Sequence, residues 1–220
     1  MSETATVEAM KLWGRSTSVN VQKVLWVMAE LGLEVERIDA GGSHGGLDSA
    51  SYSAMNPNRR IPTLQDGDLV LWESNVIVRY FSAVYGRGML HPASAADAAV
   101  ADQWMDWMQT TLSPVFIPLF WEAVRKPPSQ RSPERLSKLA EEAGQIYAIL
   151  DARLAETPWL GGQTFSMGDI PAGATLYRWF TMDIPRPDLP RLAEWFARLS
   201  ERPAYRSTVM TSYDPLRGRD

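Results

Sequence analysis

The sequence predicts an α/β domain followed by an all-helical domain. Early in the chain, short apolar stretches of strand length flank an amphipathic helix, and a hairpin signal joins two further stretches. From Ser94 onward the apolar spacing is helical throughout. We therefore place the α/β domain at residues 7–86 and the helical domain at residues 93–213. Gly86 to His91 links them, and Pro92 marks the boundary.

The composition is that of an ordinary globular protein. The chain has 220 residues, of which 45% are hydrophobic and 22% are charged, and this argues against disorder. Its net charge of −4, without a basic cluster, argues against nucleic acid or an anionic membrane surface as a partner. No apolar run has the length of a membrane span, and the start lacks signal-peptide features. We expect a cytoplasmic protein.

Two residue counts narrow the possible chemistry. The chain has no cysteine, which excludes disulfides, thiolate-bound metals and a cysteine nucleophile. Its two histidines, His44 and His91, lie far apart in the sequence, so we expect no metal site.

The first three expected elements are a strand, a helix and a strand. Val7 to Trp13 fits a strand, residues 21–31 place apolar side chains on one helical face, and residues 34–38 alternate as a second strand. This order predicts a parallel pair joined by a right-handed crossover. The segment Gly41 to Gly46 lacks the ending of a phosphate loop and is interpreted as a mobile connection.

A strand, a hairpin, a strand and a helix should follow. Ile61 to Gln65 and Leu69 to Trp72 are the two strands, and Asp66-Gly67 predicts a type I′ turn between them. Ser74 is a suitable N-cap for the following helix. The N–H groups at that helix start could hold a carboxylate.

In the second half, capping patterns indicate where helices begin. Ser94 to Asp97 and Ser166 to Asp169 have capping-box form, and Ser132-Pro133 opens a helix that runs to about Glu156. Pro114 and Pro118 should kink or break the first long helix. Residues 189–200 and 203–210 fit the closing helices.

Ile61-Pro62 and Glu73-Ser74 together resemble the glutathione site of glutathione transferases in order and spacing. The resemblance covers roughly residues 7–210. It implies a thioredoxin-like first domain with a mixed four-stranded sheet, then a helical bundle. It implies that Pro62 is cis, that Ile61 and Pro62 bind the cysteinyl part of glutathione, and that Glu73 and Ser74 hold its γ-glutamyl group. Arg60 and His44 are further candidate glutathione contacts, although His44 alone is more readily interpreted as a solvated side chain.

The residues of the first loop are candidates for activating the glutathione thiol. Ser18-Val19-Asn20-Val21-Gln22-Lys23 resembles the Thr/Ser-x-Asn-x-x-Lys pattern of bacterial Nu-type and related theta-like enzymes, which often have proline at the position of Val19. The resemblance implies that Ser18 and Asn20 are catalytic and face the sulfur. Ser16 is the second choice. These serines could also simply cap the helix.

The resemblance implies an enzyme that conjugates glutathione, as co-substrate, to small hydrophobic electrophiles in detoxification, and a homodimer. The electrophile would bind between the domains, where candidate residues are Trp107, Met108 and Thr111, with Trp104 and Phe116 nearby; the same stripe could instead be core. Two alternatives remain: a glutathione-dependent disulfide reductase or peroxidase of Nu type, and a non-enzymatic interaction module.

Overall fold

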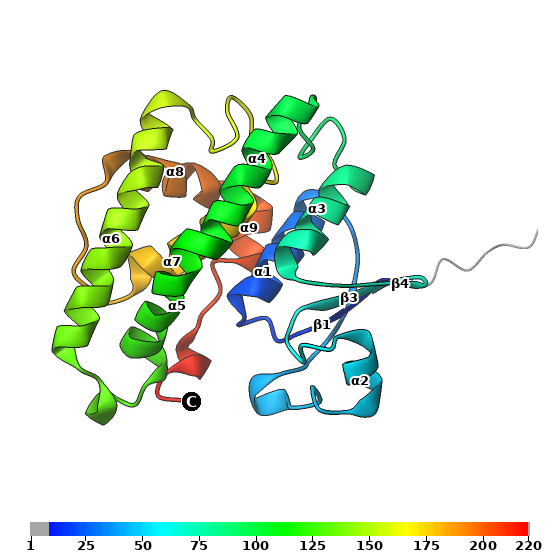
Figure 1. Ribbon diagram of the computed structural model, residues 1–220, viewed down its shortest axis with the longest axis horizontal. Helices are drawn as coiled ribbons and strands as arrows, with labels where there is room; N and C mark the ends of the chain where they lie inside the picture. The colour runs from blue at the N-terminus through cyan, green and yellow to red at the C-terminus, as the bar shows by residue number, and fades with distance from the viewer. Residues whose placement is uncertain (1–8, 220) are drawn as a thin grey trace, which may run out of the picture.

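The computed structural model describes residues 9–219 and contains a sheet domain packed against a bundle of helices (Figure 1). The sheet has four strands in the order β2-β1-β3-β4. Their bounds are β1 Lys11–Trp13, β2 Glu36–Ile38, β3 Thr63–Asp66 and β4 Leu69–Trp72. The predicted mixed four-stranded sheet is confirmed. The first strand was expected from Val7, but Val7 lies outside the described residues.

Strand pairing confirms the crossover and the hairpin. β1 and β2 are parallel, whereas β3 is antiparallel to both β1 and β4. The predicted turn type is wrong. Asp66 pairs with Leu69 inside the ladder, so the two central turn residues are Gly67 and Asp68. Only Gly67 has positive φ, at 57°, which fits a type II′ turn rather than type I′.

Helices cover both faces of the sheet. α1 (Val19–Glu30) and α3 (Ser74–Tyr85) lie on one side, and α2 (Ala50–Met55) lies on the other (Figure 1). The sequence analysis missed α2. Its N-cap is Ser49, whose Oγ accepts a hydrogen bond from the Tyr52 N–H at 3.2 Å. The preceding glycine segment contains a short 3₁₀ turn at Gly42–His44.

The second domain is helical throughout, as expected. Its helices are α4 Ala95–Trp107, α5 Ser113–Phe120, α6 Pro133–Glu156, α7 Asp169–Thr181, α8 Pro190–Ser200 and α9 Pro203–Thr208. Two of the predicted caps form with hydroxyl acceptors: Ser94 Oγ accepts from the Asp97 N–H, and Ser132 Oγ accepts from the Arg135 N–H. No helix of the described chain is long and apolar enough to span a membrane.

The two internal prolines do not break the helix. Instead, π-helical segments at Met108–Leu112 and Trp121–Arg125 precede and follow α5, and the backbone stays right-handed helical across both junctions. A π turn changes the hydrogen-bonding register, which accommodates the donor that each proline lacks. Pro114 lies in the first turn of α5 and Pro118 lies inside it. Of the expected kink or break, the break does not occur.

Helix α1 connects the two domains. It packs against α3 in the sheet domain and against α7 and α9 in the bundle. Trp26 is fully buried, and a Cβ atom added at Gly173 of α7 would come within 2.9 Å of its ring. At the helix end, the Glu30 carboxylate accepts two hydrogen bonds from Arg202, at 2.7 and 2.8 Å.

The start of α7 is held by a buried carboxylate. Asp169 is fully buried and accepts the backbone N–H groups of Ser166, at 3.0 Å, and Leu160, at 2.9 Å. The hydroxyl of Ser166 accepts from Gly168 rather than from Asp169, so only the carboxylate half of the predicted reciprocal box is formed as expected.

We predict that Asp169→Ala lowers the free energy of unfolding by about 2–6 kcal/mol, because two buried N–H groups lose their acceptor at ~1–3 kcal/mol each. Urea denaturation would measure the change. The matched control is Asp97→Ala in the exposed box at Ser94, which should cost only ~0.5–2 kcal/mol. Equal losses in the two variants would contradict the role assigned to burial.

Candidate functional site

A cavity of about 340 Å³ lies where the β1–α1 loop faces the helical domain. One side comes from the sheet domain, with loop residues 17–20 and residues 59–61. The other side comes from α5, the π-helical segment after it, α7 and Leu216. The cavity therefore brings together segments that are far apart in the sequence.

Ser18 lines this cavity with a hydroxyl group that is not used to cap the helix. Ser18 is the N-cap residue of α1, in extended conformation, yet its side chain makes no capping hydrogen bond. Its carbonyl accepts the first helical hydrogen bond, from Gln22 at 2.9 Å. Asn20, in the first turn of α1, also lines the cavity. The alternative that Ser18 acts only as a cap loses its main support.

Ser16, the second choice, is exposed and does not line the cavity. The difference follows from the loop geometry, because the Ser18 N–H donates to the Arg15 carbonyl at 3.1 Å and so closes a turn. This turn brings Thr17 and Ser18 to the cavity and leaves Ser16 outside it.

The Ile61-Pro62 segment lies next to this loop. The bond between the two residues is cis, as the resemblance predicts. Ile61 and Arg60 line the cavity, whereas Pro62 is buried beneath it. His44 does not line the cavity; it is exposed, with its Nε2 atom 3.9 Å from Asp39 Oδ1.

Glu73 and Ser74 lie at the start of α3, outside the lining of this cavity. The prediction that Ser74 is the N-cap is wrong, because Glu73 holds that position and Ser74 is the first helical residue. Glu73 has φ 70° and ψ 112°, a conformation that non-glycine residues rarely adopt. Backbone strain of this kind costs ~1–3 kcal/mol and concentrates at ligand sites.

The apolar wall of the cavity differs from the one expected. It is formed by Phe116, Ile117, Phe120, Trp121 and Leu216. Of the residues considered from the sequence, only Phe116 contributes. Trp107, Met108 and Thr111 do not line the cavity, and Met108 lies in the core at 1% exposure. The sequence pattern could not separate core from cavity, because helical periodicity identifies a buried face without saying which of the two that face meets.

Of the cationic residues at the cavity, only Arg60 was predicted from the sequence. Five arginines line the cavity: Arg15, Arg59, Arg60, Arg125 and Arg178. Among residues 9–219, no aspartate or glutamate belongs to the lining. Each arginine is unremarkable in its own stretch of sequence, and only the fold brings them together.

Arg178 of α7 also supports the β1–α1 loop. Its side chain is 5% exposed, and its Nη2 atom donates to the Thr17 carbonyl at 2.7 Å and to Gln22 Oε1 at 3.2 Å. The guanidinium lies over the Phe120 ring, 4.6 Å from the centroid. Burial lowers the pKa of Arg178 to about 10, so it remains a cation at neutral pH. The helical domain thus positions the loop that carries Ser18.

Lys23, one turn into α1, is fully buried. Its Nζ atom lies 3.4 Å from Asn75 Oδ1 in α3 and 3.5 Å from the sulfur of Met108. Asn75 in turn donates to the Met105 carbonyl at 2.9 Å. Burial lowers the pKa of Lys23 to about 7, and the negative charge of Glu73 partly opposes this shift. The side chain therefore connects α1, α3 and the first long helix of the bundle.

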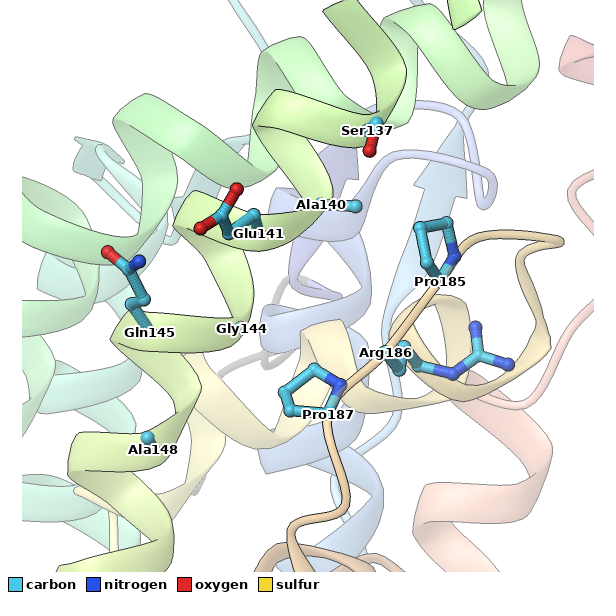
Figure 2. A pocket seen from close by; sticks show the side chains of 9 residues that line it. All are labelled: Ser137, Ala140, Glu141, Gly144, Gln145, Ala148, Pro185, Arg186 and Pro187. Atoms are coloured by element: carbon cyan, nitrogen blue, oxygen red, sulfur yellow. The ribbon is translucent and has the colours of Figure 1, made fainter. Parts of the chain in front are cut away.

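A second cavity has a volume of about 410 Å³ (Figure 2). It is a groove between α6 and the Pro185–Pro187 segment. Close approach of Pro187 depends on Gly144, because a Cβ atom there would lie 2.9 Å from the proline ring. None of its lining residues belongs to the first cavity. We therefore assign the candidate site to the first cavity.

Comparison with known proteins gives the same family for the N-terminal and the C-terminal part of the chain. Residues 8–83 match the glutathione S-transferase N-terminal domain family, and residues 133–198 match the C-terminal domain family. Glutathione S-transferase GstB of Escherichia coli K12 is 42% identical over 90% of this chain and 97% of its own. Glutathione S-transferase 3 of Zea mays is 31% identical over 91% of this chain and 93% of its own.

Solved structures agree with the sequence comparison. The glutathione-bound theta class glutathione S-transferase of Xanthomonas axonopodis pv. citri superposes with a TM-score of 0.90 at 48% identity. The match covers 93% of this chain and 98% of that one. A glutathione transferase of Bombyx mori, at 23% identity and a TM-score of 0.85, shares the fold.

We predict a pH-dependent stability that originates from Lys23. The folded-state pKa of about 7 is lower than the ordinary 10.5, so the unfolded chain binds more protons between these values. Stability should therefore rise with pH across this range. Each pH unit in this range contributes ~1.36 kcal/mol. From about pH 7 to about pH 9.5 the free energy of unfolding of the wild type should therefore rise by about 3 kcal/mol more than that of Lys23→Met.

Denaturant unfolding at a series of pH values measures this difference. Lys138→Met is the matched control, because the Lys138 side chain is 77% exposed on α6. The free energy of unfolding of Lys138→Met should change with pH in the same way as that of the wild type. If the free energy of unfolding of Lys23→Met also followed the wild type at every pH, Lys23 would be protonated in the folded protein.

Proposed function

The chain belongs to the glutathione S-transferase superfamily, and we propose that it conjugates the thiolate of glutathione to small hydrophobic electrophiles. The main support for this proposal is the hydroxyl of Ser18, which lines the interdomain cavity without a capping hydrogen bond. Asn20, the second residue of α1, lines the same cavity. We assign both residues a catalytic role.

Ser18 would act by holding the glutathione sulfur as a thiolate. A thiol has a reference pKa of ~8.5, so only a few per cent is ionised at neutral pH. A hydrogen bond to a charged acceptor contributes ~1.5–3 kcal/mol, which lowers the thiol pKa by about one to two units. The position of Ser18 at the start of α1 adds a favourable helix dipole for the same negative charge.

The remaining glutathione contacts would come from the sheet domain. Ile61 and Pro62 offer backbone groups to the cysteinyl part, and Arg60 contributes a cation at the cavity. Glu73 and Ser74 would hold the γ-glutamyl amine and carboxylate, a role supported by the rare backbone conformation of Glu73. His44 faces Asp39 at the surface, which gives it the weakest support.

The electrophile would bind against the apolar wall of the cavity. Phe116 and Phe120 supply aromatic surface there, and Leu216 adds an aliphatic side chain from the C-terminal segment. This assignment replaces Trp107, Met108 and Thr111 as the proposed electrophile contacts. We further propose that residues 7–86 and 93–213 are the two domains and that the enzyme acts in detoxification in the cytoplasm.

We predict that Ser18→Ala lowers the rate of conjugation ~10–100-fold with little change in glutathione affinity, because the lost hydrogen bond forms chiefly with the ionised sulfur. A chloro-nitroaromatic substrate gives the rate, and ultraviolet titration gives the pKa of bound glutathione, which should rise by about one to two units. Ser16→Ala is the control and should behave as the wild type.

In the reverse outcome Ser16→Ala is impaired and Ser18→Ala is active. That result would show that Ser16, and not Ser18, holds the thiolate. A protein that reduces hydroxyethyl disulfide with glutathione but leaves the chloro-nitroaromatic unchanged would instead be a disulfide reductase. Failure to bind a glutathione resin would favour a non-enzymatic module.

We also propose a homodimer that forms through β4 and α3. Of the large apolar side chains that are exposed, Leu69, Trp72, Val76, Val84, Tyr85 and Met89 all lie between β4 and the end of the interdomain link. An apolar patch of this kind is typical of a protein–protein interface. Symmetric dimers are the commonest soluble oligomers.

We predict a mass of about twice 24.6 kDa by size-exclusion chromatography with light scattering. Val76→Asp should shift the protein toward the monomer, because it buries an unpaired charge in the interface. The control, Ile149→Asp, changes an equally exposed side chain on α6 and should leave the dimer intact. A wild-type monomer would refute the proposal.

A further inference from the structure

Three of the arginines in the cavity surround its apolar wall. Arg15 comes from the β1–α1 loop, Arg125 from the π-helical segment after α5, and Arg178 from α7. None of the three has a carboxylate within ion-pair distance among residues 9–219. Three cations therefore share one cavity without a neutralising partner from the described chain.

The three side chains are held in place, and most of their donors are unused. Arg178 uses only its Nη2 atom in hydrogen bonds within the described chain. Arg125 stacks on the Trp121 ring at 4.2 Å, and its Nε donates to the Arg219 carbonyl at 3.1 Å. The Arg15 side chain, packed against the Gly41–Gly42 backbone, donates no hydrogen bond to any described residue.

The positive charges of these three arginines affect one another's pKa values. Burial lowers the pKa of Arg15, and the neighbouring Arg125 lowers it further. Burial also lowers the pKa of Arg178, and Arg15 and Arg125 add to that shift. All three nevertheless stay protonated at neutral pH, since arginine does not lose its proton in this range. An anion placed between them would relieve their repulsion and use the free donors.

Glutathione itself is one possible source of that anion, and the electrophile is the other. Arg59 and Arg60 adjoin Ile61, in the segment assigned to glutathione. Arg125 and Arg178, by contrast, come from the helical domain and stack on Trp121 and Phe120, two residues of the apolar wall. Their position favours the electrophile as the source.

We propose that Arg15, Arg125 and Arg178 form an anion subsite for the second substrate, and that this substrate is an apolar electrophile bearing a carboxylate. The inference rests on the proposed function and names its substrate class. With a 4-chloro-3-nitrobenzoate, the glutathione thiolate forms a C–S bond at the carbon that carries chlorine. The C–Cl bond breaks, chloride leaves with the bonding pair, and the carboxylate stays unchanged on the arginines.

The test compares two synthetic glutathione conjugates, S-(4-carboxy-2-nitrophenyl)glutathione and its uncharged 4-carbamoyl counterpart. They share the same glutathione part and differ only in the group that would meet the arginines. Isothermal titration calorimetry with the full chain should give at least ~10-fold tighter binding for the acid, the effect of one charge-assisted hydrogen bond. In Arg15→Met this preference should fall to about threefold or less.

Arg125→Met is a second variant from a different element, in case Arg15→Met does not fold, and it should reduce the preference likewise. Arg191→Met on α8, an arginine paired with Glu194 outside the cavity, should leave the preference unchanged. Equal affinity of the wild type for acid and amide would overturn the inference while leaving the transferase proposal intact.

If Arg15→Met weakened both conjugates equally and kept the preference, the arginines would serve glutathione, and the inference would be wrong. If neither conjugate bound the wild type at all, the proposed function itself would fail, and the subsite with it. A preference that disappears only in the Arg15 and Arg125 variants supports the subsite.

Discussion

The burial of α1 between the sheet and the bundle is the constraint on which the site depends. One side of this helix packs on α3, and the others meet α7 and α9, so even Gln22 and Lys23 are buried. A helix enclosed in this way has little freedom to rotate or shift, because interiors are packed as densely as crystals. Its first turn therefore presents Ser18 and Asn20 to the cavity in a fixed direction.

The polar groups inside that interface make the arrangement specific. Arg178 of α7 donates to Thr17 and Gln22, and thus ties the loop before α1 to the second domain. Lys23 reaches Asn75, which is itself bonded to the Met105 carbonyl. Dense packing restricts the movement of α1, and these directional hydrogen bonds further select a single position for the helix. The chemistry at Ser18 thus depends on residues in both domains.

Local patterns in the sequence predicted most of the fold. The order of strands and helices, the caps at Ser94 and Ser132, and the cis bond before Pro62 are all confirmed, and each depends on neighbouring residues or on a recognisable motif. The π turns beside Pro114 were not predicted, because they reflect a compromise between helix continuity and a missing donor.

The site was predicted less completely than the fold. Ser18 and Asn20 could be named because they are two residues apart in a motif, and the structure brings both to one cavity. Apart from Arg60, the arginines could not be named, since residues such as Arg15 and Arg178 come together only through tertiary packing. Met108 was misplaced for the same reason: periodicity identifies a buried face without saying whether it meets core or cavity.

The segment after α9 contributes Leu216 to the cavity, and the chain beyond Leu216 has few attachments to the bundle. Leu216 lines the cavity, and the residues after it are joined to the bundle by two backbone acceptors: Val124 accepts from Gly218, and Arg219 accepts from Arg125. Because residues 217–219 are exposed, substitutions among them would shift Leu216 and change the shape of the pocket at small cost to folding. Selection for new substrates could therefore act on this tail first, so related enzymes are expected to diverge most quickly there.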